Sequence, residues 1–201
     1  MDILVACEVS QRVTNELRLL GHNAFSCDIL QTTGQNKNWH IKDDVLKHID
    51  QNWDLMIAFP PCTHLAVAGA KHFKEKIKDG RQQKAIEFFM SLVYAPIDKI
   101  AIENPIGIMS KIYRKPDQII QPYYFSDSFQ KSTCLWLKNL NKLQPTKIVD
   151  KGEFITFKSG KKMPKWYSEA KENDARSVTF MGIAKAMANQ FTKPLIQTKL
   201  F

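Results

Sequence analysis

Short apolar runs alternate with amphipathic stretches along the first half of the chain. Four of these runs predict buried strands, at residues 3–6, 24–27, 55–58 and 99–102. Apolar residues recur at helical spacing between them, over 13–20, where Gly21 follows as a helix stop, and from about 81 to 93. Strand, helix and strand within residues 3–27 form a βαβ unit. The pattern therefore predicts an α/β fold with a mostly parallel sheet.

The pattern changes after Pro105. Periodicity weakens until 133–137, which is strongly β-like, and residues 139–174 are polar and lysine-rich with a hairpin signal at 154–157. A last helix follows Gly182, with its apolar residues on one face. We expect one domain over 1–201, in which 139–174 is a short basic insertion.

Size and composition favour a folded globular protein. A chain of 201 residues with 44% hydrophobic and 24% charged residues fits one domain. The apolar run at 3–6 is too short for a signal peptide or a membrane span, so we expect a cytoplasmic protein with no membrane partner. The four cysteines show no CxxC spacing and no nearby histidine pair, so we expect no metal site.

The net charge of +9 is concentrated in the C-terminal half. Residues 111–173 hold thirteen Lys or Arg against six acids, which leaves +2 for the rest of the chain. Within them, aromatic residues are interleaved with four lysines: Lys158, Lys161, Lys162 and Lys165. Such a surface can follow phosphates and offer rings for stacking on bases. A solvated lysine face over an ordinary small core is the alternative.

The strongest chemical signal is Cys62, in the run Phe59-Pro60-Pro61-Cys62-Thr63. Prolines cannot continue a central strand, so Cys62 belongs to the loop beyond the run at 55–58, at the edge where open α/β sheets place their chemistry. A second signal, the acidic motif Glu103-Asn104-Pro105, follows the run at 99–102 in the same way. A thiol and a carboxyl group at one crevice suit nucleophilic addition to an electron-poor ring.

These two motifs resemble the Pro-Cys and Glu-Asn motifs of the cytosine-C5 DNA methyltransferases, and the chain is most similar to the short members often carried by bacteriophages. The resemblance implies a Rossmann-like fold that binds S-adenosylmethionine (SAM), with 139–174 as the target-recognition region. It implies that Cys62 adds to C6 of cytosine, that Glu103 grips N3 and the exocyclic amine, and that DNA is the partner. A phage-encoded member would act in the host cytoplasm.

The same resemblance assigns cofactor-binding residues. Asp28 closes the second predicted strand where this fold places an acid on the ribose hydroxyls. Asp44 is similar to the acid that contacts the adenine amine, although the adjacent Asp43 is an alternative. Glu8 and Ser10 would contact the methionine end, and Pro60 is grouped with them. The turn at 6–11 departs from the family because it has no glycine.

A second departure lies at Lys131, in Gln130-Lys131-Ser132-Thr133. Members of the family carry a Gln-x-Arg-x-Arg motif there, so Lys131 supplies the positive charge without the planar fork of arginine. His64 could polarise Cys62, and Arg176 opens a stretch similar to the final motif of the family. Two other functions stay open: a non-catalytic nucleic-acid-binding relative, and an enzyme that modifies free pyrimidine nucleotides. The sequence leaves the oligomeric state open, a homo-oligomer included.

Overall fold

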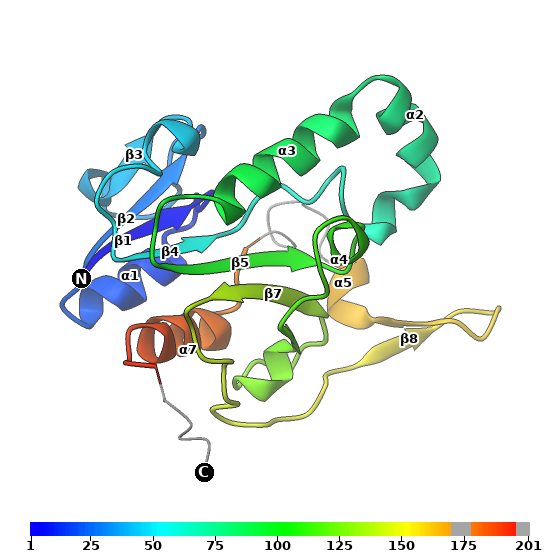
Figure 1. The fold of residues 1–201 in the computed structure, drawn as a ribbon. Coiled ribbons are helices and arrows are strands. Elements are labelled where there is room, and N and C mark those ends of the chain that lie inside the picture. The colour runs from blue at the N-terminus through cyan, green and yellow to red at the C-terminus, as the bar shows by residue number, and fades with distance from the viewer. Residues whose placement is uncertain (170–177, 196–201) are drawn as a thin grey trace, which may run out of the picture.

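The computed structural model describes residues 1–169 and 178–195, and a seven-stranded sheet runs through its centre (Figure 1). The strand order is β3-β2-β1-β4-β5-β7-β6. β1 to β5 are mutually parallel, and β7 runs antiparallel between β5 and β6. The predicted mostly parallel α/β sheet is confirmed. The strands are β1 (Asp2–Ala6), β2 (Asn23–Asp28), β3 (His40–Lys42), β4 (Leu55–Ala58), β5 (Lys99–Pro105), β6 (Gln118–Ile120) and β7 (Thr133–Lys138).

Helices cover both faces of this sheet, with α3 on one face and α1 and α7 on the other (Figure 1). Alternate strand residues feed the two cores: Ile3 of β1 packs in the layer of α1 and α7, and Leu4 packs in the layer of α3. Because both faces are buried, the strands are continuous apolar runs. The helices are α1 (Arg12–Leu19), α2 (Phe73–Lys78), α3 (Arg81–Val93), α4 (Met109–Ile112), α5 (Lys165–Glu169) and α7 (Met181–Phe191), with 3-10 turns η1 (Lys37–Trp39), η2 (Val45–Lys47), η3 (Val67–His72) and η4 (Pro122–Tyr124).

The longest helix in the described ranges, α3, has 13 residues, and none of the helices there is long and apolar enough to cross a bilayer.

The reversed strand β7 changes the expected end of β5. We expected Glu103 to lie in a loop beyond the strand, but β7 pairs with β5 from Ile100 to Pro105. Glu103 is therefore a paired residue near the end of β5, opposite Leu135. Its backbone is held by strand pairing, which fixes the starting point of the side chain more firmly than a loop would.

The turn between β1 and α1 takes glycine-like conformations without a glycine. Cys7 and Gln11 have φ angles of 59° and 56°, in the left-handed region that non-glycine residues rarely occupy. Glu8 lies between them and is buried. Its carboxylate accepts hydrogen bonds from the backbone N–H of Val13 at 2.7 Å and from the Thr14 hydroxyl at 2.7 Å. Glu8 thus supplies acceptors for the donors of Val13 and Thr14 in the first turn of α1.

A separate two-stranded hairpin projects from the body, formed by β8 (Phe154–Thr156) and β9 (Lys162–Pro164) (Figure 1). The hairpin pairs Phe154 with Pro164 and has no ladder with the main sheet. It lies within the predicted basic insertion, of which residues 170–174 fall outside the described ranges, as does Arg176.

Candidate active site

The candidate site lies where β1 and β4 run side by side and the strand order reverses direction. Open α/β sheets bind ligands in the crevice beyond the carboxyl ends of their strands at this point. The loop with Cys62 follows β4, and the turn with Cys7 and Glu8 follows β1. The two sequence motifs that predicted chemistry therefore lie at the same edge as the predicted cofactor turn.

The Cys62 loop is tied to the end of β5 by a set of short bonds. The Asn104 side-chain amide, which is buried, donates to the Pro60 carbonyl at 2.8 Å. Backbone bonds of 3.0 Å join Val67 N–H to the Ile106 carbonyl and Ile108 N–H to the Leu65 carbonyl. The nucleophile motif and the Glu-Asn motif are therefore parts of one rigid assembly.

Gly107 permits this close approach. A Cβ atom at Gly107 would overlap the Leu65 carbonyl oxygen and would lie 3.3 Å from the Cα of Ala66. Both neighbours are backbone atoms, so the overlap cannot be relieved by a side-chain rotation.

Three of the predicted catalytic residues interact electrostatically. Burial raises the pKa of the Cys62 thiol, the negative charge of Glu103 raises that pKa further, and the positive charge of Lys131 lowers it. Burial likewise raises the pKa of Glu103, with Lys131 and a hydrogen bond from Thr133 opposing the rise. The structure thus brings Cys62, Glu103 and Lys131 close enough to interact electrostatically, and burial raises the pKa of both the thiol and the carboxyl group. His64 is not among the groups that shift the pKa of Cys62.

A small crevice opens over Glu103. Its other lining residues are Lys131, Thr133, Thr179, Phe180 and Ile183. The segment that carries Lys131 is held by Gln121, whose side-chain oxygen accepts from the Lys131 N–H at 3.0 Å and whose amide donates to the Ser132 hydroxyl at 2.8 Å. Lys131 is therefore presented to the crevice by a fixed backbone.

The predicted cofactor acids lie on the other side of β1. Asp28 and Asp44 both add to the rise in the pKa of Cys7, which is chiefly due to burial, so both carboxylates lie near the β1 turn. Asp43 is bonded to Lys47 at 2.8 Å and to His48 at 3.2 Å, contacts that lower the pKa of Asp43 to about 2. The Asp44 carboxylate accepts from the Leu46 N–H at 3.0 Å, so both acids have partners within the protein and the choice between them stays open.

The other three predicted cofactor residues are engaged within the protein. The carboxylate of Glu8 is directed at the start of α1, so its predicted contact with a ligand would require breaking the bonds that begin the helix. The hydroxyl of Ser10 accepts from the Arg12 N–H at 3.4 Å. Pro60 is buried, and its carbonyl is taken by Asn104.

Two apolar residues beside Asp28 are exposed, which was not predicted from the sequence. Ile29 and Leu30 are 70% and 60% exposed. Leu30 N–H donates to the Asp28 carboxylate at 2.9 Å, which fixes the segment against the acid. An acid flanked by open apolar surface matches the two sides of a nucleoside, namely its hydroxyls and its ring face. The signal in the sequence was an apolar pair placed directly after a strand-closing acid.

A second basic surface was also not predicted from the sequence. We call residues 67–78, which form η3 and α2, the α2 arm; Figure 1 shows α2 and the β8 hairpin projecting from the side to which β5 points. The arm has four lysines against one acid, Glu75, which is bonded to Arg81 at 2.6 Å. Three of these lysines are exposed: Lys71, Lys74 and Lys78. The charge count along the sequence favoured the C-terminal half alone.

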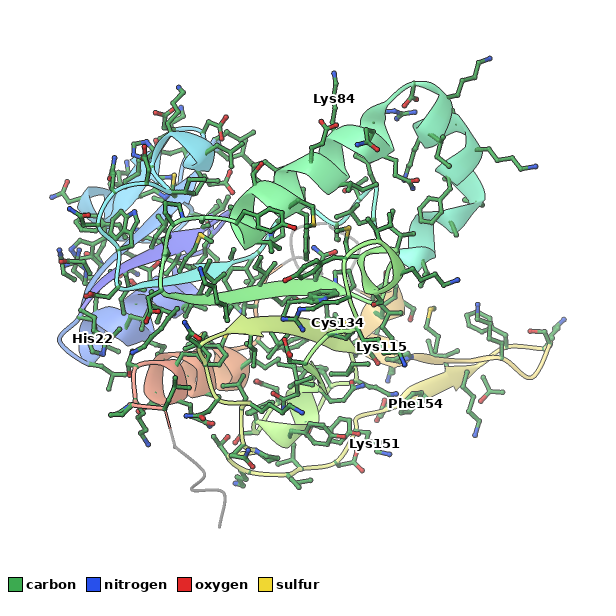
Figure 2. The ribbon with its side chains drawn as sticks, in the orientation of Figure 1. His22, Lys84, Lys115, Cys134, Lys151 and Phe154 are labelled. Carbon is green, nitrogen blue, oxygen red and sulfur yellow. The ribbon has the colours of Figure 1, made fainter. Side chains whose placement is uncertain are left out.

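The hairpin carries the predicted lysines outward. Four of them are exposed: Lys158, Lys161, Lys162 and Lys165. Lys165 is paired with Glu153 at 2.6 Å. Phe154, which Figure 2 labels on this projecting limb, and Phe157 are 41% and 44% exposed.

Trp166, which lies among the lysines of this region, packs within the protein. Its ring packs against Phe129 and Phe180 at centroid distances of 5.6 and 5.4 Å. This aromatic cluster holds the base of the hairpin beside the crevice that Phe180 lines.

In the described ranges, no group of three or more histidine, cysteine, aspartate or glutamate side chains could hold a metal ion.

Known proteins resemble this chain in fold but not in sequence. No family model matches the chain, and no curated protein matches it. Among solved structures, it is similar to an E. coli protein provisionally described as a DNA modification methyltransferase encoded within a prophage, with a TM-score of 0.50 and 12% identity over 75% of this chain and 52% of that one. The chain spans about half the length of that structure. The comparison and the strand order together identify the fold as α/β and Rossmann-like, of the methyltransferase type.

Proposed function

We propose that the protein is a SAM-dependent methyltransferase that modifies C5 of cytosine in DNA through a covalent adduct with Cys62. The observation that carries the proposal is the mutual influence of Cys62, Glu103 and Lys131 at one edge of the sheet. A thiol on the loop after β4 and a carboxyl group at the end of β5, with a cation near both, are the groups that addition to a cytosine ring needs.

The directions of the pKa shifts bear on these roles. Burial raises the pKa of Glu103, which increases the protonated fraction of its carboxyl group at a given pH, and in that form the group can donate to N3 of cytosine and draw electron density from the ring. The Cys62 thiol gives its proton to water, and its sulfur forms a bond to C6 as the C5–C6 double bond opens; the positive charge of Lys131 stabilises the attacking thiolate. C5 would take up the methyl group that SAM supplies, after which water removes the C5 proton, the C5–C6 double bond re-forms and the Cys62 sulfur leaves. The target base must leave the stack to meet these groups.

The residues present fit the adenosine half of SAM. Asp28 and Asp44 supply acids for hydroxyl and amine groups, and Ile29 and Leu30 offer apolar surface for a ring. SAM would supply the methyl group. The left-handed Cys7 gives the β1 turn the shape that a glycine would otherwise provide. We assign no ligand contact to Glu8, because the start of α1 uses its carboxylate.

The two basic projections support DNA as the substrate. The α2 arm is bonded to the Cys62 loop through Lys76, and the hairpin base contacts Phe180. The α2 arm therefore adjoins the Cys62 loop and the hairpin adjoins the crevice, and the exposed lysines of both can contact phosphates of DNA. A free nucleotide is too small to contact both projections.

Trapping with 5-fluorocytosine tests the reaction. Fluorine cannot leave C5 as a cation, so oligonucleotides with 5-fluorocytosine in all sequence contexts should form a covalent adduct in the presence of SAM. We expect Cys62→Ser to abolish the adduct and Glu103→Gln to slow it about 10²- to 10⁴-fold. Cys134→Ala, which changes a thiol buried in the α3 layer, is the matched control and should still form the adduct.

Two results would redirect the assignment. An adduct that persists in Cys62→Ser would remove Cys62 as the nucleophile. Binding of DNA without binding of SAM, measured by calorimetry, would favour a non-catalytic relative, for which the glycine-free turn is the supporting observation.

The salt dependence of DNA binding tests the hairpin. Replacing Lys158, Lys161 and Lys162 by Met should reduce the slope of log K against log salt, by about 0.9 for each phosphate of duplex DNA that is no longer neutralised. Lys165 is paired with Glu153, so Lys165→Met alone should change the slope less. An unchanged slope in the triple variant would mean that these lysines are only a solvated face.

A further inference from the structure

The loop that carries Cys62 is fixed by more than its neighbour at β5. Its backbone carbonyls accept hydrogen bonds at almost every position: Cys62 from Leu65 and Ala66 N–H, at 3.0 and 2.9 Å, and His64 from the Gln82 side-chain amide, at 3.1 Å. The carbonyl of Thr63, directly after the nucleophile, accepts from the ammonium group of Lys76 at 2.6 Å. Two of these donors, Gln82 and Lys76, come from α3 and α2.

Lys76 is an unusual donor because it is buried. Only 7% of the residue is exposed, whereas Lys71, Lys74 and Lys78 on the same arm face solvent. Burying an ammonium group costs several kcal/mol unless its partners compensate. None of the ion pairs found over the described ranges includes Lys76; the Thr63 carbonyl is its hydrogen-bond acceptor, and the Phe73 ring lies 6.0 Å away. A leucine or methionine would pack in the same space without that cost.

We propose that Lys76 is a positioning residue that sets the orientation of the Cys62 thiol through the Thr63 carbonyl. A short, charge-assisted bond to the Thr63 carbonyl restricts the ψ angle of Thr63, and so holds in place the chain that leads away from Cys62. The α2 arm, which we assign to DNA contact, is thereby linked rigidly to the nucleophile. The role of Lys76 in catalysis rests on the proposed function; its effect on the thiol does not.

Gly69 offers a second way to disturb the same bond. A Cβ at Gly69 would lie 3.1 Å from the Lys76 ammonium nitrogen and 3.4 Å from the Thr63 carbonyl oxygen, the two atoms that form the bond. Gly69 does not have a positive φ. Alanine is therefore compatible with the backbone there, and it displaces the ammonium group without removing it.

The experiment compares Lys76→Met and Gly69→Ala with wild type and with Lys84→Met. Figure 2 shows Lys84 extending from α3 into solvent, so Lys84→Met controls for loss of a lysine. The first readout is the rate of Cys62 alkylation by iodoacetamide against pH, with Cys62→Ser subtracted. The second is the rate of adduct formation with 5-fluorocytosine DNA.

We expect a released loop to expose the thiol, so that Lys76→Met is alkylated several-fold faster at neutral pH, with its profile moved to lower pH. Adduct formation should slow about 10- to 100-fold with unchanged KM for DNA, because misplacement of a reacting group acts on kcat. Gly69→Ala should change both rates in the same directions by smaller factors.

A folded Lys76→Met variant with the alkylation profile and adduct rate of Lys84→Met would overturn the proposal. If Lys76→Met does not fold, Gly69→Ala decides by the same two criteria. If wild type forms no adduct with any cytosine, the proposed function fails, and the alkylation profiles still decide whether Lys76 orients Cys62.

Discussion

Gly107→Ala tests whether the Cys62 loop and the end of β5 must be held at one distance. An added methyl would overlap the Leu65 carbonyl oxygen. The two loops would have to part by roughly 1 Å to restore ordinary van der Waals contact. Either the protein keeps its bonds and carries overpacking strain of about 1–3 kcal/mol, or it breaks the two backbone bonds of 3.0 Å at Val67 and Ile108. Breaking both would cost about 2 kcal/mol.

Both routes predict a destabilisation of about 2 kcal/mol, which lowers the Tm of a chain of this length by about 4–8 °C. Parting of the loops should also slow adduct formation about 10²-fold, because Cys62 and Glu103 no longer meet one ring together. Differential scanning calorimetry and the 5-fluorocytosine trap measure the two effects.

Gly21→Ala is the matched control. Gly21 has a φ of 83°, so alanine costs about 1–2 kcal/mol there, but no atom lies within 4 Å of the added methyl. We expect a comparable fall in Tm with a normal rate of adduct formation. The reasoning is refuted if Gly107→Ala keeps the Tm of wild type, or if its adduct forms as fast as that of Gly21→Ala.

Two further outcomes follow from the site. Lys131 lowers and Glu103 raises the pKa of Cys62, so Lys131→Met should move the pH profile of Cys62 alkylation to higher pH and Glu103→Gln should move it to lower pH; shifts of the same sign would contradict the assigned charges. Glu8→Ala should lower the free energy of unfolding in urea by about 2 kcal/mol, because it leaves buried donors at the start of α1 without an acceptor. An unchanged urea midpoint for Glu8→Ala would mean that water replaces the carboxylate.

The sequence predicted those elements whose burial gives them a strong apolar pattern. The runs at 55–58 and 81–93 became β4 and α3 because strands buried on both faces and helices with one buried face carry strong periodicity. Two three-residue strands, His40–Lys42 and Gln118–Ile120, were missed. They hold polar residues and exist through pairing with neighbours that are distant in the sequence, so no local pattern marks them.

Some features of the candidate site were likewise predictable from the sequence, and others were not. Cys62 and Glu103 were expected to face one crevice because each follows a neighbouring parallel strand. The structure places both near enough to Lys131 to interact electrostatically, and the crevice over Glu103 is lined by Lys131 but not by Cys62. The burial of Lys76 and the commitment of Glu8 to α1 could not be predicted, because each depends on a tertiary contact. A buried lysine and a solvated one are the same letter in the sequence.

The isolation of the hairpin has a consequence for how such a protein can diversify. β8 and β9 pair only with each other, and Trp166 fastens their base to the body through ring contacts rather than through a shared ladder. Insertions or exchanges at the tip, residues 158–160, leave the register of the seven-stranded sheet, and with it Cys62 and Glu103, untouched. The tip can therefore change in length and sequence without moving Cys62 or Glu103 in the fold.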